Sequence, residues 1–208
     1  MAQKKYFITG IGTNVGKTIA SAILTEALKA DYWKPVQAGD LHQTDTHKVK
    51  SLISNTNSVF YPETYCLNTP ASPHAAAKID GIEIDLAKFI IPKTKKNLII
   101  EGAGGLMVPL NQQHLVIDLI AKLNVEVILV SQNYLGSINH TLLSIALLKF
   151  SNIPVKGIIF NGETTPETEN IILKHSGLPC LLRINLEQEI SKEVVLKYAK
   201  LINTNTDF

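Results

Sequence analysis

The stretch that decides the fold runs from residue 10 to residue 18 and reads Gly10-Ile-Gly-Thr-Asn-Val-Gly16-Lys17-Thr18. It follows the apolar run 5–9 and opens an apolar helical pattern. Glycines let backbone N–H groups turn inward around phosphate oxygens, and the helix N-terminus adds the positive end of its dipole. In such a loop the lysine reaches the β- and γ-phosphates and the threonine hydroxyl ligates Mg²⁺. The stretch therefore predicts a binding loop for a nucleoside triphosphate.

The spacing of the glycines departs from the usual form of this loop. The usual pattern, Gly-x-x-x-x-Gly-Lys-Ser/Thr, has one residue fewer than the five-residue interval 11–15 that separates Gly10 from Gly16. The alternative interpretation is a tight turn rich in small residues. The strand, loop and helix order around the stretch favours a variant phosphate-binding loop.

Composition indicates a single globular α/β domain over residues 1–208. Hydrophobic residues make up 45% and charged residues 18%, which fits a packed core rather than a disordered chain. No apolar run reaches the roughly 18 residues needed to span a bilayer. The N-terminus leads into the first strand without a separate apolar leader, so we expect a cytoplasmic protein.

The charge and the cysteine content limit the classes of partner that we expect. The net charge is +2, Arg183 is the only arginine, and no basic run is interleaved with aromatic residues. Nucleic-acid readers use arginine heavily, so we expect neither a nucleic-acid nor a membrane partner. Cys66 and Cys180 lack a Cys-x-x-Cys context and are expected to be reduced and unpaired. The histidines lack metal-ligand spacing, apart from the pair His42 and His47, and are expected to bind no metal.

Apolar strand-like runs alternate with helical periods along the chain. Strands are predicted at 5–9, 32–36, 97–101, 126–131, 155–161 and 180–184, and helical patterns lie at 20–28, 44–54, 138–148 and 194–202. This alternation predicts a three-layer, Rossmann-like α/β fold, a mainly parallel β-sheet flanked by helices on both faces. The interval 39–92 is less regular and is interpreted as an excursion between strands. Residues 203–208 are predicted to form a polar tail.

Ligands of such sheets bind beyond the carboxyl ends of the strands, where several polar residues are expected. Lys34 lies at the end region of the second predicted strand and can stabilise charge on a transferred phosphoryl group, although a solvated lysine is the simpler interpretation. Glu101 ends the third strand and is followed by a glycine turn, which suits either an acid that holds Mg²⁺ or an ordinary turn. Thr18, Asp45 and Glu101 together would supply oxygen ligands suited to Mg²⁺.

Two further positions carry opposing interpretations. Residues 135–141 open a helix whose free N–H groups could hold a carboxylate, or which is simply capped by Ser137. Arg183 is the only residue that could act as an arginine finger. We expect lysines and Mg²⁺ to stabilise the γ-phosphate instead.

Five segments together resemble the dethiobiotin synthetase family, the ATP-dependent carboxylases of biotin synthesis. They are 9–18, 34–39, 70–74, 101–110 and 135–140, in matching order and spacing. The resemblance implies a P-loop NTPase fold and an ATP- and Mg²⁺-dependent ligase that forms C–N bonds. One amine of 7,8-diaminononanoate would take up CO₂, and the carbamate would attack the ATP γ-phosphate. The second amine would close the ring to dethiobiotin, releasing ADP and phosphate.

The resemblance also assigns site residues. The implied catalytic residues are Lys17, Lys34 and Thr13, and the implied metal ligands are Thr18, Asp45 and Glu101. The implied nucleotide-binding residues are Asn14, Val15, Gly16, Lys17, Thr18, Ile19, Glu101, Gly102, Gly104 and Asn161, the last reading adenine. The implied substrate-binding residues are Thr13, Lys34, Ala38, Ser72, Gly136, Ser137, Ile138 and Asn139. In the family the last four come from a second subunit, which implies a homodimer with a shared active site.

The chain departs from the family at three places. Ala38 stands where the family often has Ser or Thr, which removes a hydrogen bond to the substrate. Asn14 stands where Glu is common, which alters the charge of the loop. Residues 182–185, Leu-Arg-Ile-Asn, replace the family's Leu-Gly-x-Ile-Pro and affect the nucleotide base contacts.

Two other classes of protein share parts of this pattern. Amide-forming ligases acting on cobyrinic acid usually carry a glutamine-hydrolysing domain, which we do not expect within these 208 residues. Partitioning and cell-division ATPase switches carry a signature lysine early in the loop, and Gly12 occupies that position here. Phosphate release that depends on the diamine would distinguish the ligase from the switch.

Overall fold

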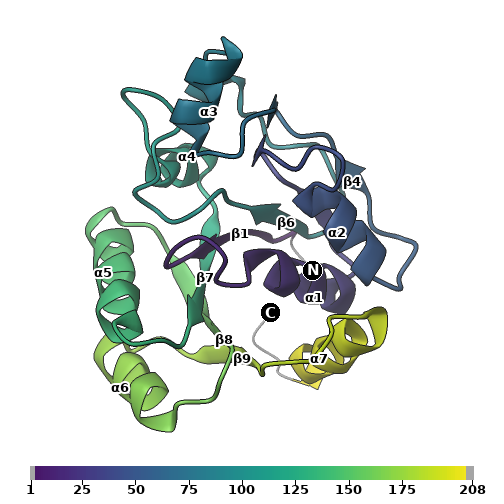
Figure 1. Cartoon of the computed structure of the whole chain (residues 1–208). Coiled ribbons are helices and arrows are strands. Elements are labelled where there is room, and N and C mark those ends of the chain that lie inside the picture. Colours follow the sequence, from purple (N-terminus) through teal and green to yellow (C-terminus); the bar gives the residue numbers. More distant parts are fainter. Residues whose placement is uncertain (1–2, 205–208) are drawn as a thin grey trace.

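A computed structural model describes residues 3–204, which form a three-layer α/β structure (Figure 1). The central sheet of the described chain has seven strands in the order β4-β2-β6-β1-β7-β8-β9, all pairing in parallel. These strands are β1 Lys5–Gly10, β2 Asp31–Trp33, β4 Phe60–Tyr61, β6 Leu98–Glu101, β7 Glu126–Gln132, β8 Val155–Asn161 and β9 Cys180–Ile184. A separate parallel pair joins β3 (Val36–Ala38) to β5 (Tyr65–Leu67).

Helices cover both faces of the central sheet, as predicted. The helices are α1 Lys17–Leu28, α2 Asp45–Leu52, α3 Pro73–Asp80, α4 Val116–Leu123, α5 Ser137–Phe150, α6 Pro166–Ser176 and α7 Lys192–Thr204, with a 3₁₀ turn η1 at Leu86–Lys88. In Figure 1, α1 and α7 lie on one side of the strands and α5 and α6 on the other. Parallel strands buried on both faces read as continuous apolar runs, which is why the sequence pattern located them.

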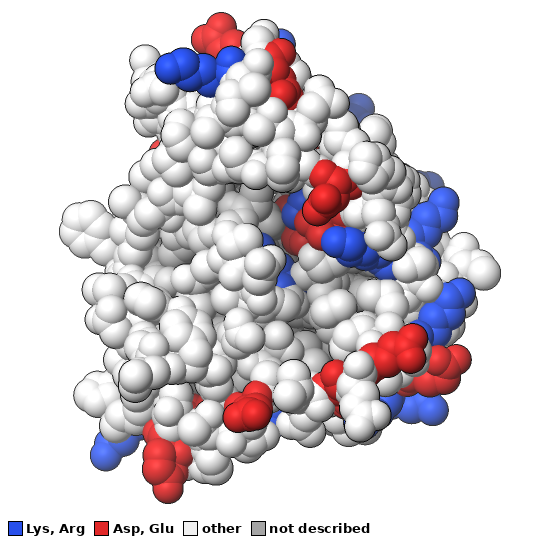
Figure 2. Space-filling view, viewed as in Figure 1, with Lys and Arg blue, Asp and Glu red and all other residues white. Residues whose placement is uncertain are grey.

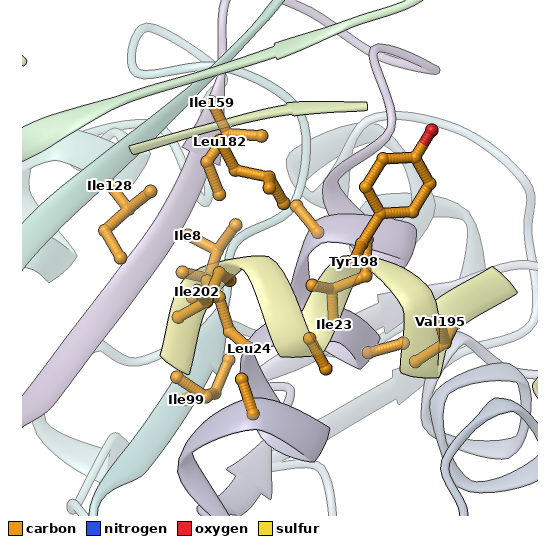
Figure 3. Packing of buried hydrophobic residues seen from close by; sticks show 14 of the residues in the cluster. Ile8, Ile23, Leu24, Ile99, Ile128, Ile159, Leu182, Val195, Tyr198 and Ile202 are labelled. Atoms are coloured by element: carbon orange, nitrogen blue, oxygen red, sulfur yellow. The ribbon is translucent and has the colours of Figure 1, made fainter. Parts of the chain in front are cut away.

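The core follows the alternation of side chains along the strands. Ile8 and Ile159 point from the sheet toward α1 and α7, where they meet Ile23 and Ile202 (Figure 3). Their strand neighbours face the opposite way: Phe7 packs in the cluster that includes α4, and Phe160 in the cluster that includes α5 and α6. Burial on both sides anchors the strands, so the loops at their carboxyl ends start from fixed positions.

The predicted strand at 32–36 is wrong in its second half. Strand β2 ends at Trp33, and Val36 begins β3 in the other sheet. Pro35 has no N–H for the ladder and restricts the residue before it, so the chain bends at Lys34. The break aims Lys34 out of the sheet at the carboxyl end of β2.

The interval 39–92 contains more regular structure than its sequence pattern indicated. The predicted helix 44–54 is α2, which Thr44 caps by accepting a hydrogen bond from the backbone N–H of His47. Strands β4 and β5 and helix α3 also lie in this interval, and they are too short for a clear hydrophobic period. No helix among residues 3–204 is long and apolar enough to cross a membrane.

Candidate functional site

The glycine loop joins β1 to α1 and contains two residues with left-handed backbone, Asn14 and Gly16. Gly16 has φ 98°, in the left-handed region, and a Cβ there would lie 2.3 Å from Nδ2 of Asn161. Asn14 has φ 60°, also left-handed, a conformation that asparagine adopts more readily than most residues. Lys17 starts α1, and its Nζ donates a hydrogen bond to the carbonyl of Gly12 at 2.8 Å. The lysine therefore reaches back across its own loop.

A cluster of charged side chains lies beside this loop. Nζ of Lys34 is 2.7 Å from Oδ2 of Asp45 and 3.2 Å from Oε1 of Glu101. The Thr18 hydroxyl lies 2.9 Å from Oε1 of Glu101 and 3.1 Å from Oδ1 of Asp45. Oε2 of Glu101 accepts a hydrogen bond from the Tyr32 hydroxyl at 2.9 Å. We call Thr18, Tyr32, Lys34, Asp45 and Glu101 the carboxylate cluster.

Sheet order explains why these residues meet. Strands β2, β6 and β1 are neighbours in the sheet, and Lys34, Glu101 and the glycine loop lie at their three carboxyl ends. Asp45 is the first residue of α2, and its backbone N–H donates to Oε1 of Gln37 at 3.2 Å. In Figure 2 a hollow near the middle of this face contains both blue and red side chains.

The two lysines have opposite electrostatic environments. Burial lowers the pKa of Lys17 to about 8, because the charge of Glu101 compensates the lost hydration only in part. Burial also acts against the charge of Lys34, but Glu101 and Asp45 outweigh it and raise the pKa of Lys34 above its usual value. For Asp45, burial is likewise outweighed by Lys34, which lowers the pKa of that carboxyl. Lys34 therefore keeps its charge to higher pH than Lys17, whose pKa is about 8.

The donor set fits Mg²⁺ held together with a nucleotide. The described residues contain no group of three or more His, Cys, Asp or Glu side chains that could hold a metal alone. The Thr18 hydroxyl and the carboxylates of Asp45 and Glu101 converge within hydrogen-bonding distance. Mg²⁺ in phosphate sites commonly takes one or two carboxylates and completes its octahedron with phosphate oxygens and waters. The predicted trio provides that partial set.

The structure brings the other predicted nucleotide residues to the same loop. Nδ2 of Asn161, at the end of β8, donates to the carbonyl of Val15 at 3.0 Å. A Cβ on Gly104 would lie 3.7 Å from Oγ1 of Thr13, and one on Gly105 would lie 3.2 Å from the carbonyl of Gly10. The turn after β6 thus packs directly on the phosphate loop. Ile19 is in the first turn of α1, and Gly102 directly follows Glu101.

The predicted substrate residues Ala38 and Ser72 lie in two adjoining segments. Ala38 ends β3, and Ser72 precedes α3, with its Oγ 3.1 Å from Nδ1 of His74. Gly39 packs so closely against Pro70 that a Cβ would lie 2.6 Å from the proline Cβ. This contact joins the segment after β3 to the segment before α3.

The start of α5 differs from one expectation. Gly136, with φ 103°, caps the helix, and Ser137 is its first residue, so the interpretation of Ser137 as N-cap is wrong. No hydrogen bond or ion pair in residues 3–204 joins Gly136, Ser137, Ile138 or Asn139 to Lys34 or Glu101. Within the described chain these residues therefore make no polar contact with Lys34 or Glu101.

Arg183 is held away from the phosphate loop. Its guanidinium forms an ion pair with the buried carboxylate of Glu169 and lies 5.8 Å from the centroid of the Phe160 ring. Phe160 belongs to the cluster on the α5 and α6 side of the sheet, opposite α1. The guanidinium is engaged by Glu169, and the expectation that lysines and Mg²⁺ stabilise the γ-phosphate stays a prediction.

Sequence reasoning missed two members of the site, Tyr32 and Gln37. Gln37 connects the two sides of the segment before α2: its Oε1 accepts from Asp45, and its Nε2 donates to the Gly39 carbonyl at 2.9 Å. Tyr32 lies two residues before Lys34 in the predicted strand 32–36, a spacing that would put both side chains on one face of a continuous strand, although β2 ends at Trp33. That spacing was the available signal for Tyr32.

Comparisons with known proteins agree with this geometry. A family profile described as an AAA domain matches residues 4–194. The chain is 57% identical to "ATP-dependent dethiobiotin synthetase BioD" of Christiangramia forsetii, over 95% of both sequences. It is also 57% identical to the protein of the same name from Cytophaga hutchinsonii, over 94% of this chain and 95% of that one.

Solved structures with a similar fold come from a different functional class. The septum site-determining protein MinD of Pyrococcus horikoshii, solved with Mg-ADP, has a TM-score of 0.58 at 16% identity, covering 100% of this chain and 91% of that one. A putative plasmid partition protein of Borrelia burgdorferi, bound to AMPPNP, has a TM-score of 0.58 at 14% identity, covering 97% of each chain. At such low identity the likeness shows the fold alone.

Proposed function

The chain belongs to the ATP-dependent dethiobiotin synthetase family, and we propose that its phosphate loop and carboxylate cluster carry out that family's reaction. The enzyme is a ligase of biotin synthesis that forms C–N bonds, converting 7,8-diaminononanoate, CO₂ and ATP into dethiobiotin, ADP and phosphate. One observation carries the assignment of roles: Nζ of Lys34 lies between Asp45 and Glu101 beside the Thr18 hydroxyl. This places a fixed positive charge where the phosphate loop ends.

The first steps need charge neutralisation more than covalent catalysis by the protein. One amine nitrogen bonds to the carbon of CO₂ and loses a proton, giving a carbamate. A carbamate oxygen then attacks the γ-phosphorus, and the bond to the ADP oxygen breaks. Lys34, with its raised pKa, acts as a cation that attracts the carbamate and the moving phosphoryl group rather than as a base.

The residues of the loop hold the triphosphate during this transfer. Lys17 pairs with the β- and γ-phosphates, and Thr13 contacts the diamine or the carbamate. Thr18, Asp45 and Glu101 hold Mg²⁺, which when bound neutralises charge on the phosphate oxygens. In the last step the second amine attacks the carbamoyl carbon, and phosphate leaves with the bonding electrons. Asn161 reads the adenine, and Ala38 and Ser72 line the diamine site.

The active site is proposed to be completed by a second copy of the chain. Residues 136–139 have no hydrogen bond or ion pair to the carboxylate cluster in the described chain. The outer face of α5 carries exposed apolar side chains, Leu143 at 60% and Phe150 at 86% exposure, and Leu135 before the helix is fully exposed. An apolar helix face of this kind suits a homodimer interface that brings Asn139 to the partner's Lys34.

Complementation between two inactive variants tests the shared site. In a mixed dimer of Lys34→Ala and Asn139→Ala chains, one of the two sites combines intact Lys34 with intact Asn139. Random exchange should therefore restore about a quarter of wild-type activity. Failure of the mixed sample to regain activity, with dimers present by sedimentation, would refute the shared site.

Phosphate release tests the function itself. It should require both the diamine and bicarbonate, and it should vanish with Lys17→Ala or Lys34→Ala. Lys122→Ala, which removes an exposed lysine of α4, is the matched control and should retain activity. Steady hydrolysis of ATP without the diamine, stimulated by DNA or lipid, would instead indicate a partitioning ATPase switch.

The remaining parts of the proposal concern organisation and surroundings. Residues 1–208 are proposed to act as one domain, because the helices on both faces share one sheet. The partners are the small-molecule substrates and a second copy of the chain, not nucleic acid or membrane. We propose a cytoplasmic location for this biosynthetic enzyme.

A further inference from the structure

The Tyr32 hydroxyl reaches the carboxylate cluster from inside the core. Its side chain is 0% exposed, and its ring packs against Phe60 with 5.6 Å between the ring centroids. Tyr32 also belongs to the apolar cluster formed with α1 and α7. From this position the hydroxyl donates its hydrogen to Oε2 of Glu101 at 2.9 Å. The ring therefore packs in the core, and the hydroxyl contacts the carboxylate cluster.

The two oxygens of Glu101 consequently have different roles. Oε1 faces the Thr18 hydroxyl at 2.9 Å and Nζ of Lys34 at 3.2 Å, on the side of the phosphate loop. Oε2 faces the core and is occupied by Tyr32. Glu101 itself is only 1% exposed, so no bulk water competes for Oε2.

We propose that Tyr32 is a positioning residue that favours Mg²⁺ over Ca²⁺. Its hydrogen bond to Oε2 of Glu101 leaves only Oε1 to coordinate the cation of the nucleotide. Mg²⁺ demands a near-ideal octahedron and readily takes one oxygen of a carboxylate. Ca²⁺ takes six to eight oxygens at longer distances and accepts both oxygens of one carboxylate. A carboxylate fixed through Oε2 cannot turn to offer both oxygens. The inference rests on the proposed role of Glu101 as a metal ligand.

The simpler interpretation is that a buried phenol bonds to the nearest acceptor and has no effect on the metal. The two interpretations predict different results when only the hydroxyl is removed. A bond with a purely structural role changes stability alone. A bond that orients Glu101 changes the relative affinity for two cations of equal charge.

Tyr32→Phe is the test variant, because it keeps the ring in the core. Calorimetric titration of the ADP-bound protein with Mg²⁺ and with Ca²⁺ gives the affinity ratio without turnover. We expect the variant to lower the ratio of the Mg²⁺ affinity to the Ca²⁺ affinity by about tenfold. That change corresponds to the loss of one hydrogen bond to a charged group. In turnover, the Mg²⁺ concentration at half-maximal rate should rise more than kcat falls.

Tyr65→Phe is the matched control. Tyr65 is also buried, and its hydroxyl accepts a hydrogen bond from the backbone N–H of Asp85 at 2.8 Å, away from the carboxylate cluster. It should leave the cation ratio unchanged. If thermal unfolding shows that Tyr32→Phe is only partly folded, the same titrations at a lower temperature, where more of the variant is folded, provide the second measurement.

Two results would overturn the inference, and they are distinguishable. An unchanged cation ratio in folded Tyr32→Phe, with metal-dependent ADP binding intact, refutes the role of Tyr32 alone. Wild-type protein that binds ADP with no dependence on any divalent cation refutes the proposed metal site, and the role of Tyr32 with it.

Discussion

The side-chain amide of Asn161 donates a hydrogen bond to the carbonyl of Val15, across 146 residues of sequence. Asn161 ends β8, two strands away from β1 in the sheet, and its amide braces the middle of the phosphate loop. The same amide stands where a Cβ on Gly16 would lie, only 2.3 Å from Nδ2. The conformation of the loop and the position of the proposed adenine reader are therefore coupled.

Asn161→Ala is expected to raise the KM for ATP about thirtyfold while changing kcat little. The substitution removes one hydrogen bond to the loop and the proposed contact to the base, each contributing about 1 kcal/mol. Steady-state kinetics with ATP and with GTP measure the effect. A variant that keeps the ATP affinity and the preference for ATP would show that Asn161 neither braces the loop nor reads the base.

Gly16→Ala is expected to lower the free energy of unfolding by about 2 kcal/mol and to weaken ADP binding at least about tenfold. The left-handed backbone costs about 1 kcal/mol for alanine, and the Cβ displaces the Asn161 amide from Val15. Gly177→Ala is the matched control, since Gly177 has φ 67° with nothing within 4 Å of the added Cβ. The control should lose about 1 kcal/mol and keep its ADP affinity. Equal losses of ADP affinity in both variants would contradict the argument.

The affinity for ATP should fall as the pH rises above about 8. Burial lowers the pKa of Lys17 to about 8, so the side chain loses its charge above that pH. The charged form attracts the phosphates, so binding should take up a proton near pH 8, and affinity should drop by up to about tenfold per pH unit above it. Calorimetry in buffers of different ionisation enthalpy measures the proton uptake. Lys17→Arg should lose this pH dependence, and its persistence in that variant would exclude Lys17 as the titrating group.

Arg183→Ala is expected to lower stability by about 2 kcal/mol without lowering kcat. The substitution leaves the Glu169 carboxylate, which is 1% exposed, without its cation. Urea unfolding and turnover at saturating ATP are the measurements. Adding Glu169→Gln should recover part of the lost stability, because it removes the uncompensated charge. Loss of turnover with intact ATP affinity would instead identify Arg183 as an arginine finger.

Some site residues could be predicted from the local sequence, and others could not, because their contacts involve residues elsewhere in the chain. The phosphate loop, Lys34 and Glu101 were predictable because each lies next to a buried strand, and the ends of parallel strands meet at one edge. Tyr32 and Gln37 were not predicted, because their role depends on partners 69 and 8 residues away. The family resemblance indicated a changed charge at Asn14, whereas the structure adds a backbone reason, its left-handed conformation.

The sequence alone determined the layered α/β fold, the phosphate loop and the residues at the strand ends. Those features depend on hydrophobic periods and on glycine and lysine at fixed spacing, which are local properties of the chain. Only the tertiary structure decided that the chain breaks between Trp33 and Val36 into two sheets, and that Arg183 pairs with Glu169 away from the loop. Only the tertiary structure assigned one oxygen of Glu101 to the loop and the other to Tyr32. Such choices depend on which distant side chains packing brings within hydrogen-bonding distance, and no local pattern records them.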